Sequence, residues 1–136
     1  MKKRYIMQSE VFDIEYLTAQ CVDGIMEVQY KDNVYITLEE AKYIVEERIK
    51  FFGDHQYPCL LKSSRLKGID RQARKYLFNE GLTNLLAIAL VPNNKVGQMI
   101  TTIVVNFESP KIPWGVFKSH GEARNWLKQY IEEGHV

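Results

Sequence analysis

The chain has 136 residues, which is the size of one compact domain and leaves little room for a second. Hydrophobic residues make up 46% of it and charged residues 26%, a balance that excludes an intrinsically disordered chain. The chain contains 18 Lys and Arg and 17 Asp and Glu, so its net charge is +1. Such a small net charge gives no overall electrostatic field that would attract the protein to nucleic acid.

The N-terminal segment MKKRYIMQSE is basic, but it has no apolar core and no small-residue cleavage site, so it is not typical of a signal peptide. We expect a single domain over residues 1–136 in which residues 1–8 form a flexible or edge segment. No apolar run approaches the roughly 18 residues that span a bilayer, so no transmembrane segment is expected. Cys21 and Cys59 lie in apolar contexts and are interpreted as buried free thiols of a cytoplasmic protein.

Two antiparallel strands are predicted at the start of the chain, near residues 10–20 and 25–31. Hydrophobic and acidic residues alternate along FDIEY, and hydrophobic and polar residues alternate along IMEVQY. Asp23-Gly24 between them is a strong signal for a two-residue turn.

The first helix is predicted to begin after Thr37, because Thr37 and Glu40 match a capping box, and to end at Gly53. Its apolar residues recur at helical spacing, and this core-facing stripe consists of Leu38, Ala41, Ile44, Val45, Ile49 and Phe52. A short buried strand, YPCLL, is predicted to follow at residues 57–61.

A second helix is predicted from its cap at Asp70 through Asn79, ending before Gly81. The unbroken apolar run LLAIALV at 85–91 favours a central strand that is covered on both faces. A third helix is expected over residues 93–107, although its β-branched residues make a strand the competing prediction.

The stretch WGVF follows two prolines and is predicted to form a short edge strand, because proline is tolerated at the edge of a sheet. Ser119 and Glu122 match a second capping box, which opens a last helix with Trp126 on its apolar face. The resulting order is β-β-α-β-α-β-α-β-α. We therefore predict an α/β sandwich with a mixed sheet of about five strands, covered by about four helices.

This pattern resembles the STAS/SEC14-like small domains, which include the SpoIIAA-like anti-sigma factor antagonists, and among them short stand-alone bacterial proteins of uncharacterised activity. The resemblance rests on the D-G hairpin and on the segments ITLEEAKYIVEERI, ARKYLFNEG, AIALV and FKSHGEARNWLKQYI. It implies a STAS-like sandwich that acts as a non-catalytic regulatory or protein-interaction domain. The alternative that it implies is a small apolar-ligand or lipid-binding protein of the SEC14-like type.

In the sigma-regulating relatives, a strand ends in Asp-Leu-Ser and the next helix opens with Asp-Ser, whose serine is phosphorylated. Here Lys62-Ser63-Ser64 stands at the first position, and Arg71 follows Asp70 at the second. Because Arg71 occupies the phosphoacceptor position, the resemblance argues against a conventional phosphoswitch. Phosphorylation of Ser63 or Ser64 remains a separate hypothesis.

The segment around the second helix start is a candidate interaction or anion-binding surface, because its polar residues are mostly basic and free amides point out of a helix N-terminus. Its residues are Ser63, Ser64, Arg65, Lys67, Asp70, Arg71, Arg74 and Lys75. The competing interpretation is an ordinary crossover, in which Asp70 caps the helix and the basic side chains are solvated or paired with acidic residues of the first helix.

A second candidate surface is an apolar patch at the predicted edge strand and third helix, formed by Ile103, Val104, Ile112, Trp114 and Val116. Such a patch suits either a homodimer contact or the rim of a pocket for a small apolar ligand. Trp126 is expected in the core.

Catalytic and metal-binding motifs are absent from the sequence. The three histidines, His55, His120 and His135, have neither metal-ligand spacing nor a neighbouring cysteine, and no nucleophile-elbow motif is present. We therefore expect no enzyme activity and no cofactor. The expected partner is another protein or a small apolar ligand, and not nucleic acid, because no basic strand interleaved with aromatic residues occurs.

Overall fold

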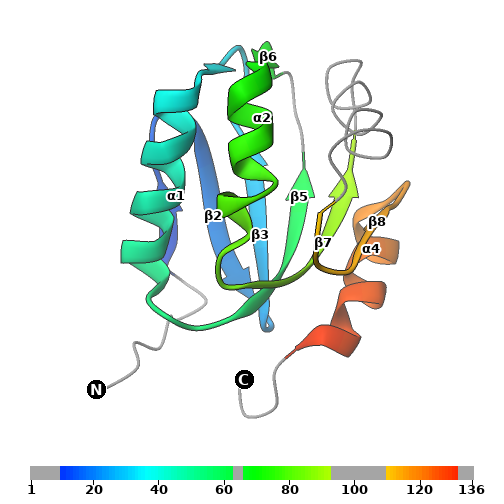
Figure 1. Ribbon diagram of the computed structural model, residues 1–136. Helices are drawn as coiled ribbons and strands as arrows, with labels where there is room; N and C mark the ends of the chain where they lie inside the picture. The colour runs from blue at the N-terminus through cyan, green and yellow to red at the C-terminus, as the bar shows by residue number, and fades with distance from the viewer. Residues whose placement is uncertain (1–9, 63–65, 93–109, 132–136) are drawn as a thin grey trace.

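The computed structural model describes residues 10–62, 66–92 and 110–131, and these form a sheet with helices on both faces. Figure 1 shows α1 (Leu38–Phe52) and α2 (Arg71–Leu77) side by side across one face of the sheet. The last helix, α4 (His120–Leu127), packs against the opposite face through a separate apolar cluster. The predicted α/β sandwich is confirmed, with six strands in the main sheet and three α-helices among the described residues.

The main sheet has the strand order β1-β2-β3-β5-β7-β8, and it changes from antiparallel to parallel at its centre. The first three strands form an antiparallel meander: β1 (Val11–Asp13), β2 (Leu17–Val22) and β3 (Ile25–Tyr30). The remaining strands are parallel to β3: β5 (Tyr57–Lys62), β7 (Leu85–Val91) and β8 (Trp114–Val116). A separate parallel pair joins β4 (Tyr35–Ile36) to β6 (Gly68–Ile69).

The single strand predicted over residues 10–20 is wrong, because the chain reverses there and forms β1 and β2. The Ile14 amide donates to the Leu17 carbonyl at 3.1 Å, which closes the reversal, and Val11 pairs with Gln20. Alternation of hydrophobic and acidic residues continues through the turn, so the period-two pattern alone hides the break.

The predicted turn between β2 and β3 is confirmed, and it depends on backbone in the left-handed region. Asp23 has φ 49° and Gly24 has φ 82°. Both values suit a tight hairpin turn, in which glycine carries no steric cost.

Substitution of Gly24→Ala should therefore destabilise the protein by about 1 kcal/mol, because alanine in the left-handed region brings its Cβ against the backbone. Urea denaturation should show a lower midpoint with an unchanged slope. Gly121→Ala is the matched control: a Cβ built at Gly121, inside α4, meets nothing within 4 Å. An equal loss in both variants would contradict the assignment of the effect to the turn.

Helix α1 begins and ends as predicted. The Thr37 amide donates to the Glu40 carboxylate at 2.9 Å, and the Glu40 amide donates to Thr37 Oγ1 at 3.4 Å, so both halves of the capping box are present. Gly53 follows the helix with φ 74°, and its amide donates to the Ile49 carbonyl. These caps fix where the buried face of α1 lies over the sheet.

Helix α2 is shorter than predicted. It spans Arg71–Leu77, and a 3₁₀ turn, η1 (Glu80–Leu82), follows it. Asp70 occupies the N-cap position, but its side chain makes no capping hydrogen bond, so the predicted role of its carboxylate as the cap is wrong. The first turn of α2 is instead held by the Arg74 amide, which donates to the Asp70 carbonyl at 2.9 Å.

Strand β7 is covered on both faces, as its unbroken apolar run predicts. Ile88 and Leu90 belong to the main core under α1 and α2, whereas Ala87 and Ala89 face the α4 cluster. The edge strand predicted at WGVF is confirmed as β8, which pairs only with β7 among the described strands. The third helix predicted over 93–107 lies outside the described residues.

Candidate functional site

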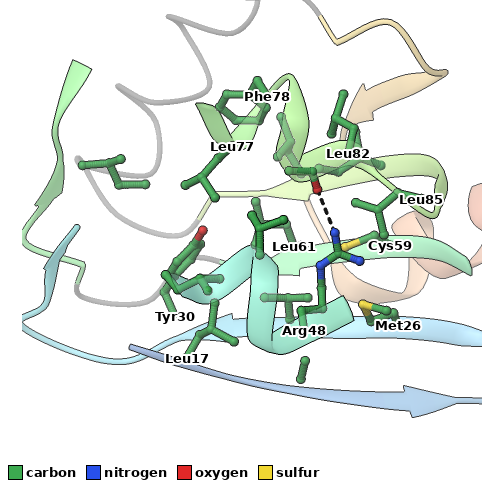
Figure 2. A pocket seen from close by; sticks show the side chains of 18 of the residues that line it. Leu17, Met26, Tyr30, Arg48, Cys59, Leu61, Leu77, Phe78, Leu82 and Leu85 are labelled. Carbon is green, nitrogen blue, oxygen red and sulfur yellow. Dashed lines mark hydrogen bonds between the residues drawn. The ribbon is translucent and has the colours of Figure 1, made fainter. Parts of the chain in front are cut away.

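The main structural candidate for a site is an apolar cavity of about 100 Å³ between the sheet and the helices α1 and α2. Figure 2 shows its lining side chains, which come from strands β2, β3, β5 and β7, from both helices and from η1. Aliphatic side chains such as Leu61, Leu77 and Leu82 form most of the wall. The cavity therefore lies within the main core and is partly open to the molecular surface.

One charged side chain, Arg48 of α1, lines this cavity and is only 8% exposed. Its Nη2 donates to the carbonyl of Gly81 at 3.1 Å and to that of Thr83 at 2.9 Å. Burial lowers the pKa of the guanidinium, because removal from water penalises the charged form. Among the described residues, no carboxylate forms an ion pair with Arg48.

Two further polar side chains line the cavity, and both are neutral at physiological pH. Burial raises the pKa of the Cys59 thiol to about 12, and it also raises the pKa of the Tyr30 hydroxyl. Neither group therefore supplies a negative charge to Arg48. The cavity thus combines an apolar wall with a single positive charge.

The cavity lies close to the protein surface beside η1. A shallow surface depression is lined by Asn79, Glu80, Thr83, Lys111 and Ile112, and also by two residues that line the cavity, Phe78 and Leu82. Phe78 is 6% exposed and stands between the two spaces. Leu82, which also lines both spaces, lies in η1.

The position of Arg48 follows from the helical period of α1. Arg48 is four residues after Ile44 and four before Phe52, so all three fall on one face of the helix. All three are buried. The predicted stripe assigned Ile49 to that face and passed over Arg48, although the spacing is a signal that could have identified this residue.

The predicted basic surface divides into side chains with different environments. Lys67, Arg71 and Lys75 are exposed. Arg74 is half-buried, because its Nη1 donates to the Ile69 carbonyl at 2.6 Å, so it does not lie on a solvated face as predicted. Ser63, Ser64 and Arg65 lie outside the described residues, so the serine hypothesis is untested.

The predicted apolar patch is only partly described. Ile112 and Trp114 are half-buried and pack against the main core. Val116 is 43% exposed on the edge strand β8. Ile103 and Val104 lie outside the described residues. Among the three described residues of the patch, only Val116 is exposed.

A second polar cluster, centred on Glu27 of β3, lies on the opposite face of the sheet. The Glu27 carboxylate accepts a hydrogen bond from Arg124 at 2.5 Å and lies 2.9 Å from Nε2 of His120. Lys62 Nζ is 4.0 Å away. Arg124 also donates to the Val22 carbonyl at 2.9 Å, so the cluster ties α4 to two strands.

Sequence reasoning did not find the Glu27 cluster. Glu27 is the polar member of an alternating strand, which the pattern explains without any partner. His120 and Arg124 are 93 and 97 residues away along the chain. Only the packing of α4 on the sheet brings the three side chains together.

Both cysteines are buried and free, as predicted. Among the described residues, no group of three or more His, Cys, Asp and Glu side chains could hold a metal ion. Within the same described residues, no helix has both the length and the apolar character that crossing a membrane requires.

The family described as a domain of unknown function, DUF7793, matches residues 19–131, which contain every residue of the cavity wall except Leu17. The chain belongs to this family. No curated protein matches the DUF7793 chain. Among solved structures it is similar to an uncharacterised protein of the DUF3478 family with a SpoIIAA-like fold, from Shewanella loihica PV-4.

That similarity covers 82% of this DUF7793 chain and 91% of the Shewanella chain, with a TM-score of 0.54 and 12% sequence identity. At such low identity the comparison establishes the fold alone. It confirms the predicted resemblance to the SpoIIAA-like group at the level of fold.

Proposed function

We propose that this protein is a non-catalytic binding domain of the SpoIIAA-like type that holds a small apolar molecule in the cavity beneath α1 and α2. The observation that carries the proposal is a space of about 100 Å³ inside the main core. Protein interiors pack as densely as organic crystals and contain few voids larger than a water molecule. Most of the wall is apolar, and such a surface suits an apolar ligand better than it suits water, which is held only beside polar groups such as Arg48.

Small side chains in the wall leave this space. Ala19 on β2 and Gly81 in η1 both line the cavity, and each is buried. Larger residues at these positions would extend into it. The small residues Ala19 in the sheet and Gly81 in η1 therefore leave the space open, and this supports a binding role.

Filling the cavity should abolish the binding of a small apolar probe. Toluene should raise the melting temperature of the wild-type protein, because it binds the folded state only. The increase should disappear in Ala19→Leu and in the smaller Ala19→Val. Thr18→Leu is the matched control, because Thr18 is half-exposed on the same strand and points to the other face.

Differential scanning fluorimetry over a range of toluene concentrations measures this effect. An unchanged melting temperature of the wild type would contradict the proposal. The same would follow if Ala19→Leu, folded by circular dichroism, still responded to toluene as Thr18→Leu does.

A second candidate function is binding of an acidic protein surface by the exposed basic side chains Lys67, Arg71 and Lys75. None of the three forms an ion pair with another described residue. The first lies just before β6 and the other two on α2, so they flank the same strand-to-helix junction. This observation supports the interaction-domain hypothesis, but it does not identify a partner.

Reversal of the charge on two of these basic side chains should abolish the recovery of such an acidic partner. Arg71→Glu combined with Lys75→Glu changes only exposed side chains and leaves Arg74 and its hydrogen bond to the Ile69 carbonyl intact. Lys118→Glu combined with Lys128→Glu makes the same charge change at exposed positions beside and after α4. The measurement is a pulldown at increasing salt concentration with the wild type and both double variants. Equal recovery of proteins by all three would contradict binding through Lys67, Arg71 and Lys75.

A further inference from the structure

We infer that the molecule held in the cavity is a small monocarboxylate with an apolar body, whose carboxylate is bound by Arg48. The inference rests on the proposed binding function and assigns the chemical class of its ligand. It is carried by the buried guanidinium in the cavity wall, which no described carboxylate neutralises.

A buried guanidinium without a counter-ion is costly. Arginine keeps its charge in proteins, and an ion removed from water loses several kcal/mol of solvation unless an opposite charge replaces it. The carbonyls of Gly81 and Thr83 satisfy hydrogen bonds of Arg48, but they carry no net charge. The two carbonyls account for the hydrogen bonds of Nη2 but not for the charge, so the buried guanidinium favours an anionic partner.

The geometry of Arg48 leaves donors for such a partner. Both hydrogen bonds of the guanidinium are made by Nη2, and within the described residues Nη1 has no hydrogen bond. The two carbonyls also hold the guanidinium in one orientation beside Cys59 and Leu82 (Figure 2). A carboxylate that enters the cavity therefore meets a preorganised donor, which reduces the entropic cost of binding.

The size of the cavity limits the apolar body. An apolar cavity of about 150 Å³ in another protein accepts benzene. The space here is smaller, about 100 Å³, but it is partly open to the surface, so a single ring or a short branched chain fills it and a long acyl chain is too large. Arg48 is the one charged side chain of a mainly apolar wall, so the shape of the wall selects the apolar body and the charge of Arg48 selects the head group.

Three probes of similar size and different charge test the inference: benzoate, benzyl alcohol and benzylammonium. Isothermal titration calorimetry on the wild-type protein should give at least about tenfold tighter binding for benzoate than for benzyl alcohol, as expected for one hydrogen bond to a charged group. Benzylammonium should bind most weakly. Arg48→Met should remove the preference and retain benzyl alcohol binding.

Two further variants keep the test decisive. Arg48→Lys retains a positive charge and should keep a reduced preference for benzoate, so it replaces Arg48→Met if that variant does not fold. Lys50→Met removes an exposed cation two residues further along α1 and should keep the full preference, because Lys50 does not line the cavity. An equal loss in Lys50→Met would assign the preference to the general field and overturn the inference.

The outcomes separate the two proposals. Equal affinity of the wild type for benzoate and benzyl alcohol would overturn the carboxylate inference and leave the apolar binding function standing. Binding of none of the probes, together with no response to toluene, would overturn the binding function itself. Benzoate preference that depends on Arg48 supports both.

Discussion

Replacement of Phe52 by alanine should lower the free energy of unfolding by about 4 kcal/mol, which is within the range for a buried phenylalanine. Phe52 is 1% exposed at the end of α1. Its ring lies 4.9 Å from that of Phe51 and 6.0 Å from those of Phe12 and Tyr57, measured between centroids. Its loss would leave a cavity where β1, β5 and α1 meet, and partial collapse would not refill it.

Phe51→Ala is the matched control, because Phe51 precedes Phe52 on the same helix and is only half-buried. It should cost roughly half as much, since less of its surface is removed from water. Guanidinium denaturation followed by circular dichroism measures both variants. An equal cost for the two positions would contradict the assignment of Phe52 as the aromatic anchor of this end of the core.

Removal of the Glu27 carboxylate should have the second largest effect. Glu27→Ala leaves Arg124 with its side chain only 19% exposed and without its carboxylate partner. A buried ion pair that loses one member costs up to about 3–5 kcal/mol, and partial exposure of the pair reduces our expectation to about 2 kcal/mol. The loss arises mainly from the charge left behind and not from the attraction that is lost.

A double-mutant cycle distinguishes these two causes. Arg124→Met combined with Glu27→Ala should recover part of the stability lost in Glu27→Ala, because no uncompensated charge remains. The exposed pair Lys31–Asp13 is the control: Asp13→Ala should cost at most about 0.5 kcal/mol, since its members are 39% and 61% exposed. Additive effects of Glu27→Ala and Arg124→Met in chemical denaturation would contradict the coupling.

The elements predicted most accurately from the sequence are those with capping or turn residues at their ends. The capping residues Thr37 and Ser119 and the turn at Asp23-Gly24 are local signals, and all three are found where the pattern places them. The break between β1 and β2 was missed because the turn there lacks glycine and proline. The cap at Asp70 was predicted from residue type alone, whereas the structure closes that turn through the backbone.

The candidate site was less accessible to sequence reasoning for a physical reason. A cavity results from the volumes of side chains that meet across several elements, and no local pattern encodes the space between Ala19 on β2 and Gly81 in η1. The burial of Arg48 could have been predicted, because Arg48 is four residues from both Ile44 and Phe52 and so lies on the same face of α1. The predicted stripe contained hydrophobic residues only, so it did not include Arg48, although the spacing from Ile44 and Phe52 places Arg48 on the buried face.

The two tryptophans of the chain lie in different layers. Trp114 packs against the main core, whereas Trp126 packs in the α4 layer, with ring centroids 5.3 Å from Phe117 and 5.0 Å from Tyr130. Each layer therefore contains one tryptophan. Single-tryptophan forms made by Trp114→Phe or Trp126→Phe would show by their emission whether α4 leaves the sheet before the layer that encloses the cavity comes apart.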